Sequence, residues 1–96
     1  MEIDDRIKCL NSKTKIMICL VLESEKMALP EIVKRIESDF KSESNRETIY
    51  RSIESLRRLG IVNKDYFPEE RKIKYSLNIS KVEIDFIKKK ILFHKR

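Results

Sequence analysis

The sequence has few of the residues on which most catalytic and metal sites depend: its 96 positions include one glycine, two prolines, two cysteines and one histidine. The single glycine excludes most nucleotide-binding loops, because such loops need several glycines to bring the backbone close to a phosphate. No nucleophile stands at a meaningful spacing from a base, and no carboxylate cluster accompanies the histidine. We therefore expect no catalytic residues, no cofactor and no small-molecule ligand, so the protein is not expected to be an enzyme.

A metal site is not expected either. Cys9 and Cys19 are ten positions apart without a CxxC partner, and His94 lies far along the chain from both. Structural zinc sites instead bring closely spaced pairs of ligands together. We expect two reduced and largely buried thiols; the alternative, a disulfide, would suit a hyperthermophilic source.

Long hydrophobic runs are absent as well. The longest covers residues 16–22, seven positions, whereas a membrane-spanning helix needs about 20. No leading segment has the pattern of a signal peptide, so we expect a soluble protein of the cytoplasm with no membrane partner. With 41% hydrophobic and 40% charged residues, residues 1–96 are expected to fold as a single domain.

Positive charge is concentrated in the second half of the chain. Residues 1–43 hold 8 basic and 9 acidic side chains, whereas residues 44–96 hold 14 basic and 7 acidic ones, so the net charge of +6 is carried by the later segment. This asymmetry suggests that one face contacts a polyanionic partner, although a basic solvated surface would give the same count.

Apolar spacing predicts three helices before residue 44. In residues 2–10 the apolar side chains recur at helical spacing, and residues 12–25 surround an apolar centre, IMICLVL, with charged helix formers. These flanks favour a helix there over a buried strand. In MALPEIVKRIESDF, Pro30 suits the first turn of a short amphipathic helix.

The stretch SNRETIYRSIESLRRLG predicts the most distinctive helix, over residues 44–59. Ser44 and Glu47 form the S-x-x-E pattern of a capping box at its start, and Gly60 is the expected left-handed stop. On a helical wheel the apolar and charged residues separate, so one side should pack and the other should face outward. The packed side holds Ile49, Ile53 and Leu56, and the outward side holds Glu47, Arg51, Glu54 and Arg58, flanked by Thr48 and Ser55.

The segment after Gly60 predicts a β-hairpin with one buried face. IVNKDYF leads into a turn at PEERK, and in IKYSLNI the apolar residues alternate with Lys74, Ser76 and Asn78.

The end of the chain, residues 80–96, is predicted to be a helix. Ser80 and Glu83 repeat the S-x-x-E pattern, and apolar residues fall into two stripes on nearly opposite sides. Because one domain surface cannot easily cover both stripes, we expect a homodimer built from this helix and residues 2–10. The predicted dimer interface comprises Ile3, Ile7, Leu10, Ile84, Ile87 and Ile91.

In this order of elements the chain resembles the winged helix-turn-helix transcription regulators of the MarR and PadR kind, and the small winged-helix proteins of archaea and their viruses. The resemblance covers about residues 12–79 and rests on TIYRSIESLRRLGIV followed by a strand, a charged turn and another strand. It implies an α+β, mainly α fold, in which a three-helix core carries a β-hairpin wing and a C-terminal dimerisation helix.

The resemblance also implies a function, sequence-specific binding of double-stranded DNA by a homodimeric transcription regulator. Residues 44–59 would lie in the major groove, and the wing, residues 67–72, would lie on the adjacent backbone or minor groove. A helix N-terminus offers free N–H groups to phosphate, and an arginine can bridge guanine O6 and N7. The expected DNA-binding residues are Ser44, Asn45, Arg46, Thr48, Arg51, Ser55, Arg58, Arg71, Lys72 and Lys74.

Three acidic residues on the expected DNA side favour other partners. Glu54 lies on the outward face of the predicted recognition helix, and Glu69 and Glu70 lie at the tip of the wing, where they would repel phosphates. The alternative is a winged helix that serves as a protein-interaction module within a larger assembly, and an RNA-binding winged helix is a third possibility.

Overall fold

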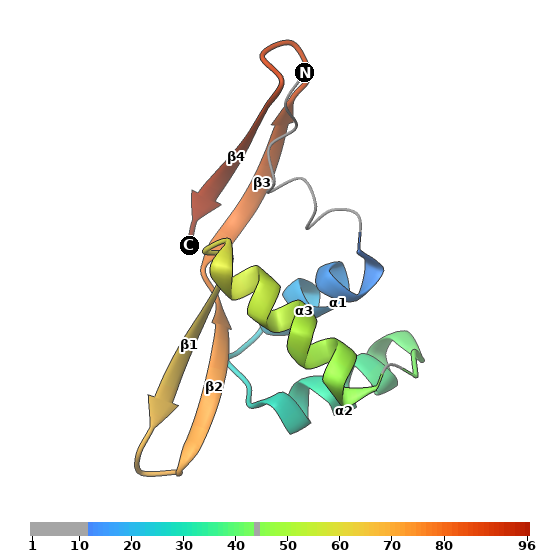
Figure 1. Cartoon of the computed structure of the whole chain (residues 1–96), viewed down its shortest axis with the longest axis vertical. Helices are drawn as coiled ribbons and strands as arrows, with labels where there is room; N and C mark the ends of the chain where they lie inside the picture. Colours follow the sequence, from blue (N-terminus) through green and yellow to red (C-terminus); the bar gives the residue numbers. More distant parts are fainter. Residues whose placement is uncertain (1–11, 44) are drawn as a thin grey trace.

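Three helices precede two β-hairpins in the computed structural model, which describes residues 12–43 and 45–96 (Figure 1). The predicted α+β class is confirmed, and three helices followed by a hairpin are compatible with a winged-helix topology. The predicted helix over residues 2–10, with Ile3, Ile7 and Leu10, lies outside the described residues. The elements are α1 (Lys13–Leu22), α2 (Leu29–Phe40), α3 (Arg46–Arg58), β1 (Val62–Phe67), β2 (Lys72–Leu77), β3 (Ile79–Asp85) and β4 (Lys90–Lys95).

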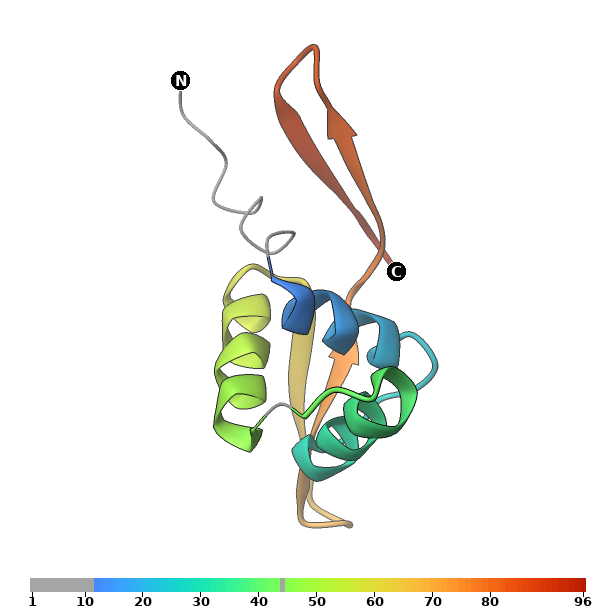
Figure 2. The same ribbon diagram turned by 90° about the vertical axis from the view of Figure 1, so that its right-hand side faces the viewer.

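The core lies where α1, α2 and α3 meet the inner side of β1 and β2 (Figures 1 and 2). Each helix contributes its apolar stripe, and Ile18, Ile32 and Ile53 are completely buried. The apolar centre of α1 is covered on one side only, since Ile16 and Leu20 remain 42% and 57% exposed. None of the described helices is both long enough and apolar enough to cross a membrane.

Helix α3 begins one residue later than the capping-box pattern predicted. Asn45 is the N-cap, and its side-chain Oδ1 accepts a hydrogen bond of 2.7 Å from the backbone N–H of Thr48. Glu47 contacts Arg51, about one turn further along the helix. Ser44 lies outside the described residues.

The end of α3 follows the prediction for Gly60. This glycine has a φ of +78°, and the N–H of Gly60 donates to the carbonyl oxygen of Arg57 while that of Ile61 donates to Leu56, both at 3.0 Å. These two bonds form a Schellman motif, which turns the chain into β1. Leu56 and Ile61 are both buried in the core, so the helix end is also held by an apolar contact.

Gly60→Ala is expected to lower the free energy of unfolding by about 1–2 kcal/mol, because an L-residue is strained at positive φ. No atom lies within 4 Å of the added Cβ, so the cost should come from the backbone and not from a steric clash. Urea denaturation followed by circular dichroism measures the change. Unaltered stability would contradict the assigned role of Gly60 in the Schellman motif.

The first hairpin, β1–β2, is joined by a third short segment. Its strands are antiparallel, with Val62 opposite Leu77 and Phe67 opposite Lys72. Met27, between α1 and α2, forms an antiparallel bridge to Tyr75 through N–O distances of 3.0 and 2.8 Å. The bridge fixes the hairpin against the helices.

The predicted C-terminal dimerisation helix is wrong: residues 80–96 lie mostly in β3 and β4, which form a second antiparallel hairpin. Cross-strand partners lie on the same face of a hairpin, and the pairs Val82–Phe93 and Ile84–Ile91 therefore gather four apolar side chains on one face. A helical wheel had placed them on two sides. Ser80 and Glu83, the predicted capping box, both lie in β3.

Hydrogen bonds at Asn78 connect the base of the second hairpin to the rest of the domain. The backbone N–H of Asn78 donates to Ile61 at 2.8 Å, and its carbonyl oxygen accepts from the N–H of Arg96 at 2.9 Å. The Arg96 guanidinium donates to the carbonyl oxygen of Glu23 at 2.6 Å, beyond the end of α1. Figures 1 and 2 show that the two hairpins project in opposite directions from the helices, along the 46 Å axis of the molecule.

Candidate nucleic-acid interface

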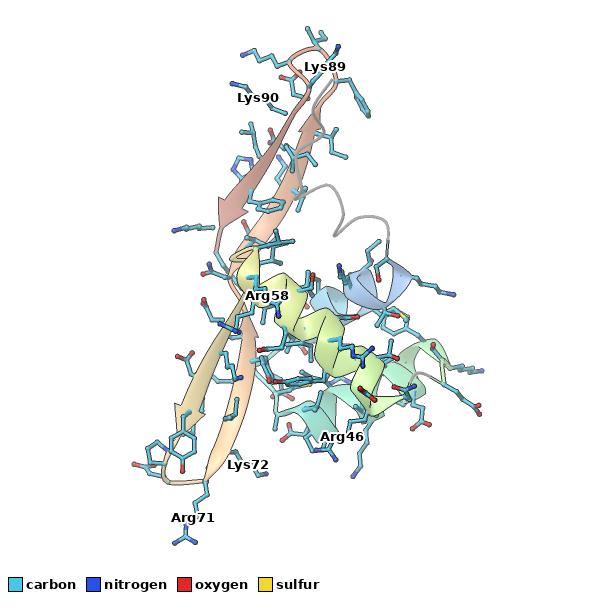
Figure 3. The ribbon with its side chains drawn as sticks, viewed as in Figure 1. Arg46, Arg58, Arg71, Lys72, Lys89 and Lys90 are labelled. Carbon is cyan, nitrogen blue, oxygen red and sulfur yellow. The ribbon has the colours of Figure 1, made fainter. Side chains whose placement is uncertain are left out.

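The outer face of α3 carries most of the predicted DNA-binding residues. Asn45, Arg46, Thr48, Arg51 and Arg58 are exposed. Their helix is held by a completely buried stripe on its other side, so these side chains are presented on a fixed element. Figure 3 shows Arg46 and Arg58 near opposite ends of α3. Ser55, also predicted, is only partly exposed.

Arg51 forms an ion pair that leaves it available to a ligand. One of its guanidinium nitrogens lies 2.6 Å from Oε1 of Glu47, but the Arg51 side chain is 76% exposed. Exposed i,i+4 pairs contribute only about 0.3–0.5 kcal/mol, so a phosphate or a base can compete for the guanidinium. Within the described part of the chain, Arg46 and Arg58 form no ion pair with an acidic side chain.

Glu54 is compensated by two basic residues. Arg57 donates to its two carboxylate oxygens at 3.1 and 3.2 Å, and Lys64 of β1 approaches to 3.8 Å. The hydrogen bond from Arg57, followed by the charge of Lys64, lowers the pKa of Glu54 despite partial burial. The carboxylate that appeared to oppose DNA therefore joins α3 to the first hairpin, and its charge is balanced locally.

The turn of the first hairpin contains a similar pair. The Lys74 amine lies 2.5 Å from Glu70, is only 19% exposed, and sits 5.3 Å from the centre of the Phe67 ring. The hydrogen bond from Lys74 lowers the pKa of Glu70. Lys74, a predicted DNA-binding residue, is thus engaged within the hairpin, whereas Arg71 and Lys72 are exposed and make no ion pair with any described residue.

Lys72→Ala is expected to weaken binding equally for specific and random duplexes, and to reduce the slope of log affinity against log salt by about one, as removal of one phosphate contact does. Titrations by fluorescence anisotropy at several salt concentrations measure both quantities. Lys13→Ala, which changes an exposed lysine at the start of α1, is the control. A loss confined to one DNA sequence would contradict a backbone role for Lys72.

The sequence prediction missed a basic group at the tip of the second hairpin. Lys88, Lys89 and Lys90 fall within the C-terminal helix predicted over residues 80–96, whereas they lie at the turn and the first position of β4. The alternation of apolar and polar residues in VEID, residues 82–85, is a local signal that is compatible with a strand there. Among the described residues, no group of three or more His, Cys, Asp or Glu side chains is placed to hold a metal ion.

The chain matches no protein-family model and no curated protein. Function is therefore inferred from the arrangement of the side chains.

Proposed function

We propose that the protein binds double-stranded DNA as a winged-helix transcription regulator, with α3 in the major groove and residues 67–72 on the adjacent backbone. The charge distribution carries this proposal. Glu54 and Glu70 are compensated by internal basic partners, whereas Arg46, Arg58, Arg71 and Lys72 have no acidic partner in the described chain. Glu69, at the hairpin turn, also forms no ion pair with any described residue, so the uncompensated positive charge lies mainly on the exposed face of α3.

The shape of this surface suits DNA. An α-helix with its side chains is about 10–12 Å across and fits the major groove, which is about 12 Å wide. The N-terminus of α3 is exposed at Asn45 and Arg46, so its backbone N–H groups can approach a phosphate. Arg51, one turn further along, can reach a base edge, where a guanidinium bridges O6 and N7 of guanine.

The salt dependence of binding tests this proposal. If Arg46, Arg58, Arg71 and Lys72 each neutralise one phosphate, the slope of log affinity against log salt should be about −3.6 or steeper. Affinity would then fall at least about 150-fold between 50 and 200 mM salt. Anisotropy titrations of a labelled random-sequence duplex give the slope. Binding that is insensitive to salt would contradict the proposal.

A homodimer remains part of the proposal, without the helix first expected to form it. Leu20 of α1 and Ile84 of β3 are 57% and 47% exposed, which leaves apolar surface for a second copy. A two-fold dimer would bind a palindromic site whose half-sites lie about 34 Å apart. Sedimentation equilibrium determines the oligomeric state. A protein that is monomeric at all concentrations would contradict the homodimer, and a palindromic binding site would then not be expected.

A protein-interaction module is the second candidate function, and one observation favours it. A largely apolar groove of about 280 Å³ lies between α1 and the start of β3, lined in part by Ile16, Leu20 and Val82. A docked peptide could occupy this groove with the outer face of α3 left free. Failure to bind duplex DNA even at low salt would favour this candidate.

A further inference from the structure

The tip of the second hairpin exposes two bulky apolar side chains. Phe86 and Ile87 are 83% and 93% exposed, the highest values among the large hydrophobic residues described as exposed. Turns normally carry polar or small residues, because apolar side chains at such positions gain nothing from the fold. Burial of either side chain by a partner would be favourable, because it removes apolar surface from water. The tip therefore has the character of a contact surface.

The turn holds these side chains in a defined position. The carboxylate oxygen Oδ1 of Asp85 accepts hydrogen bonds from the backbone N–H groups of Ile87, at 3.0 Å, and Lys88, at 2.9 Å. Lys89 takes a positive φ of 56° and completes the reversal of the chain. At the base, Val82 and Phe93 pack against the core, so the hairpin is anchored at one end and presents its tip at the other.

Positive charge surrounds the apolar tip. Lys88, Lys89 and Lys90 are exposed and form no ion pair with any described residue, and residues 86–90 carry a charge of +3. The corresponding residues of the first hairpin, 68–72, have two glutamates, one arginine and one lysine and therefore no net charge. Of the two hairpin tips, the second is the one whose charge suits the minor groove.

The two tips lie on either side of α3. Figure 3 places Lys89 and Lys90 at one end of the molecule, Arg71 and Lys72 at the other, and Arg46 and Arg58 between them on α3. The long axis measures 46 Å, and successive minor grooves on one face of DNA are about 34 Å apart. With α3 in a major groove, a duplex along this axis presents a flanking minor groove near each tip.

We propose that the second hairpin is a DNA-bending arm: Phe86 and Ile87 wedge between base steps in the flanking minor groove while Lys88, Lys89 and Lys90 contact the adjacent phosphates. Apolar wedges in the minor groove partly unstack base steps and kink the duplex by about 20–90°. This inference rests on the proposed DNA binding by α3. Lys89 and Lys90 lie at the end of the same elongated molecule whose middle carries Arg46 and Arg58 on α3 (Figure 3), which favours DNA over an anionic membrane as the partner of the tip.

Resonance energy transfer between dyes at the two ends of a 30-base-pair mixed-sequence duplex tests the arm separately from binding. Saturating wild-type protein should raise the transfer efficiency, because a kink shortens the end-to-end distance. The double variant Phe86→Ser/Ile87→Ser should still saturate the duplex when its concentration is raised. At saturation, most of the rise in transfer efficiency seen with wild-type protein should be lost. Tyr66→Ser, which changes an exposed aromatic residue of β1, is the matched control and should bend DNA as the wild type does.

A second variant tests the lysines by a different readout. Replacing Lys88, Lys89 and Lys90 together with alanine should reduce the slope of log affinity against log salt by about 2.7, as the loss of three phosphate contacts does. Thermal unfolding should be unchanged in both tip variants, because the altered side chains lie outside the core. An unchanged slope of log affinity against log salt would contradict the proposed contacts of these three lysines with phosphates.

The possible failures are distinguishable. Saturation of the duplex by wild-type protein without a rise in transfer would overturn the bending arm and leave DNA binding by α3 intact. Absence of any binding would overturn both proposals. Bending that persists in the double variant, together with wild-type-specific sedimentation on vesicles of phosphatidylserine and phosphatidylcholine, would assign the tip to a membrane surface instead.

Discussion

Ile53→Ala is expected to lower the free energy of unfolding by about 2–5 kcal/mol, the range measured when a buried isoleucine or leucine is truncated to alanine. Ile53 is completely buried at the centre of α3 and belongs to the main core cluster. Its truncation removes apolar contacts and leaves a cavity between the helices. Because small domains are stable by only about 5–15 kcal/mol, this single change should remove a large share of the stability.

Urea denaturation at 25 °C followed by circular dichroism measures this loss. Ile73→Ala is the matched control, since Ile73 lies on β2 with 43% of its surface exposed. Its replacement should cost no more than about 1 kcal/mol, the span of strand propensities. Equal losses in the two variants would contradict the position assigned to the core. DNA binding by Ile53→Ala should decline only as far as the protein unfolds.

Arg51→Ala is expected to weaken binding to a specific duplex by about 1–3 kcal/mol, which corresponds to a rise in Kd of about 5- to 150-fold. The loss of its pair with Glu47 should change the unfolding free energy by only about 0.3–0.5 kcal/mol. A large effect on affinity with a small effect on stability separates a base-reading arginine from a solvated surface pair. Anisotropy titrations and urea denaturation of the same variant provide both numbers.

Arg35→Ala is the control for this comparison. Arg35 also forms an i,i+4 ion pair, with Asp39 at 3.1 Å, but it lies on α2. The two substitutions should therefore cost similar stability, and only the one on α3 should raise Kd. Equal losses for specific and random duplexes in Arg51→Ala would remove that residue from the group that reads bases.

Local patterns made α3 predictable from the sequence. Ile49, Ile53 and Leu56 recur at helical spacing and are all buried, and Gly60 ends the helix at positive φ as expected. Helix periodicity and a glycine stop depend on residues close in the chain. The cap was misplaced by one residue because Asn45 is as good an N-cap as a serine at the preceding position.

The second hairpin could not be derived from the same local patterns. Val82, Ile84, Ile91 and Phe93 fit two stripes of a helix and one face of a hairpin, and a short apolar pattern does not separate the two. The S-x-x-E pattern at residues 80–83 favoured the helix. Pairing between β3 and β4 places all four residues on one face. A helical wheel describes the periodicity of one segment and cannot show the pairing of two strands.

The electrostatics of the candidate interface were predictable only in part. The pair Glu47–Arg51 follows from i,i+4 spacing, but Lys64 reaches Glu54 from β1, across the junction of helix and hairpin. Such a contact depends on the tertiary fold. The sequence therefore assigned Glu54 to a repulsive role, whereas the structure shows its charge compensated by Arg57 and Lys64.

Selection from a pool of random-sequence duplexes, repeated over several rounds at two salt concentrations, tests DNA binding most directly. We predict that retention of the duplexes falls with salt and that one sequence is enriched, a palindromic one if the protein is a homodimer. Wild-type protein that retains no duplex at either salt concentration would contradict DNA binding by α3 and favour a protein partner.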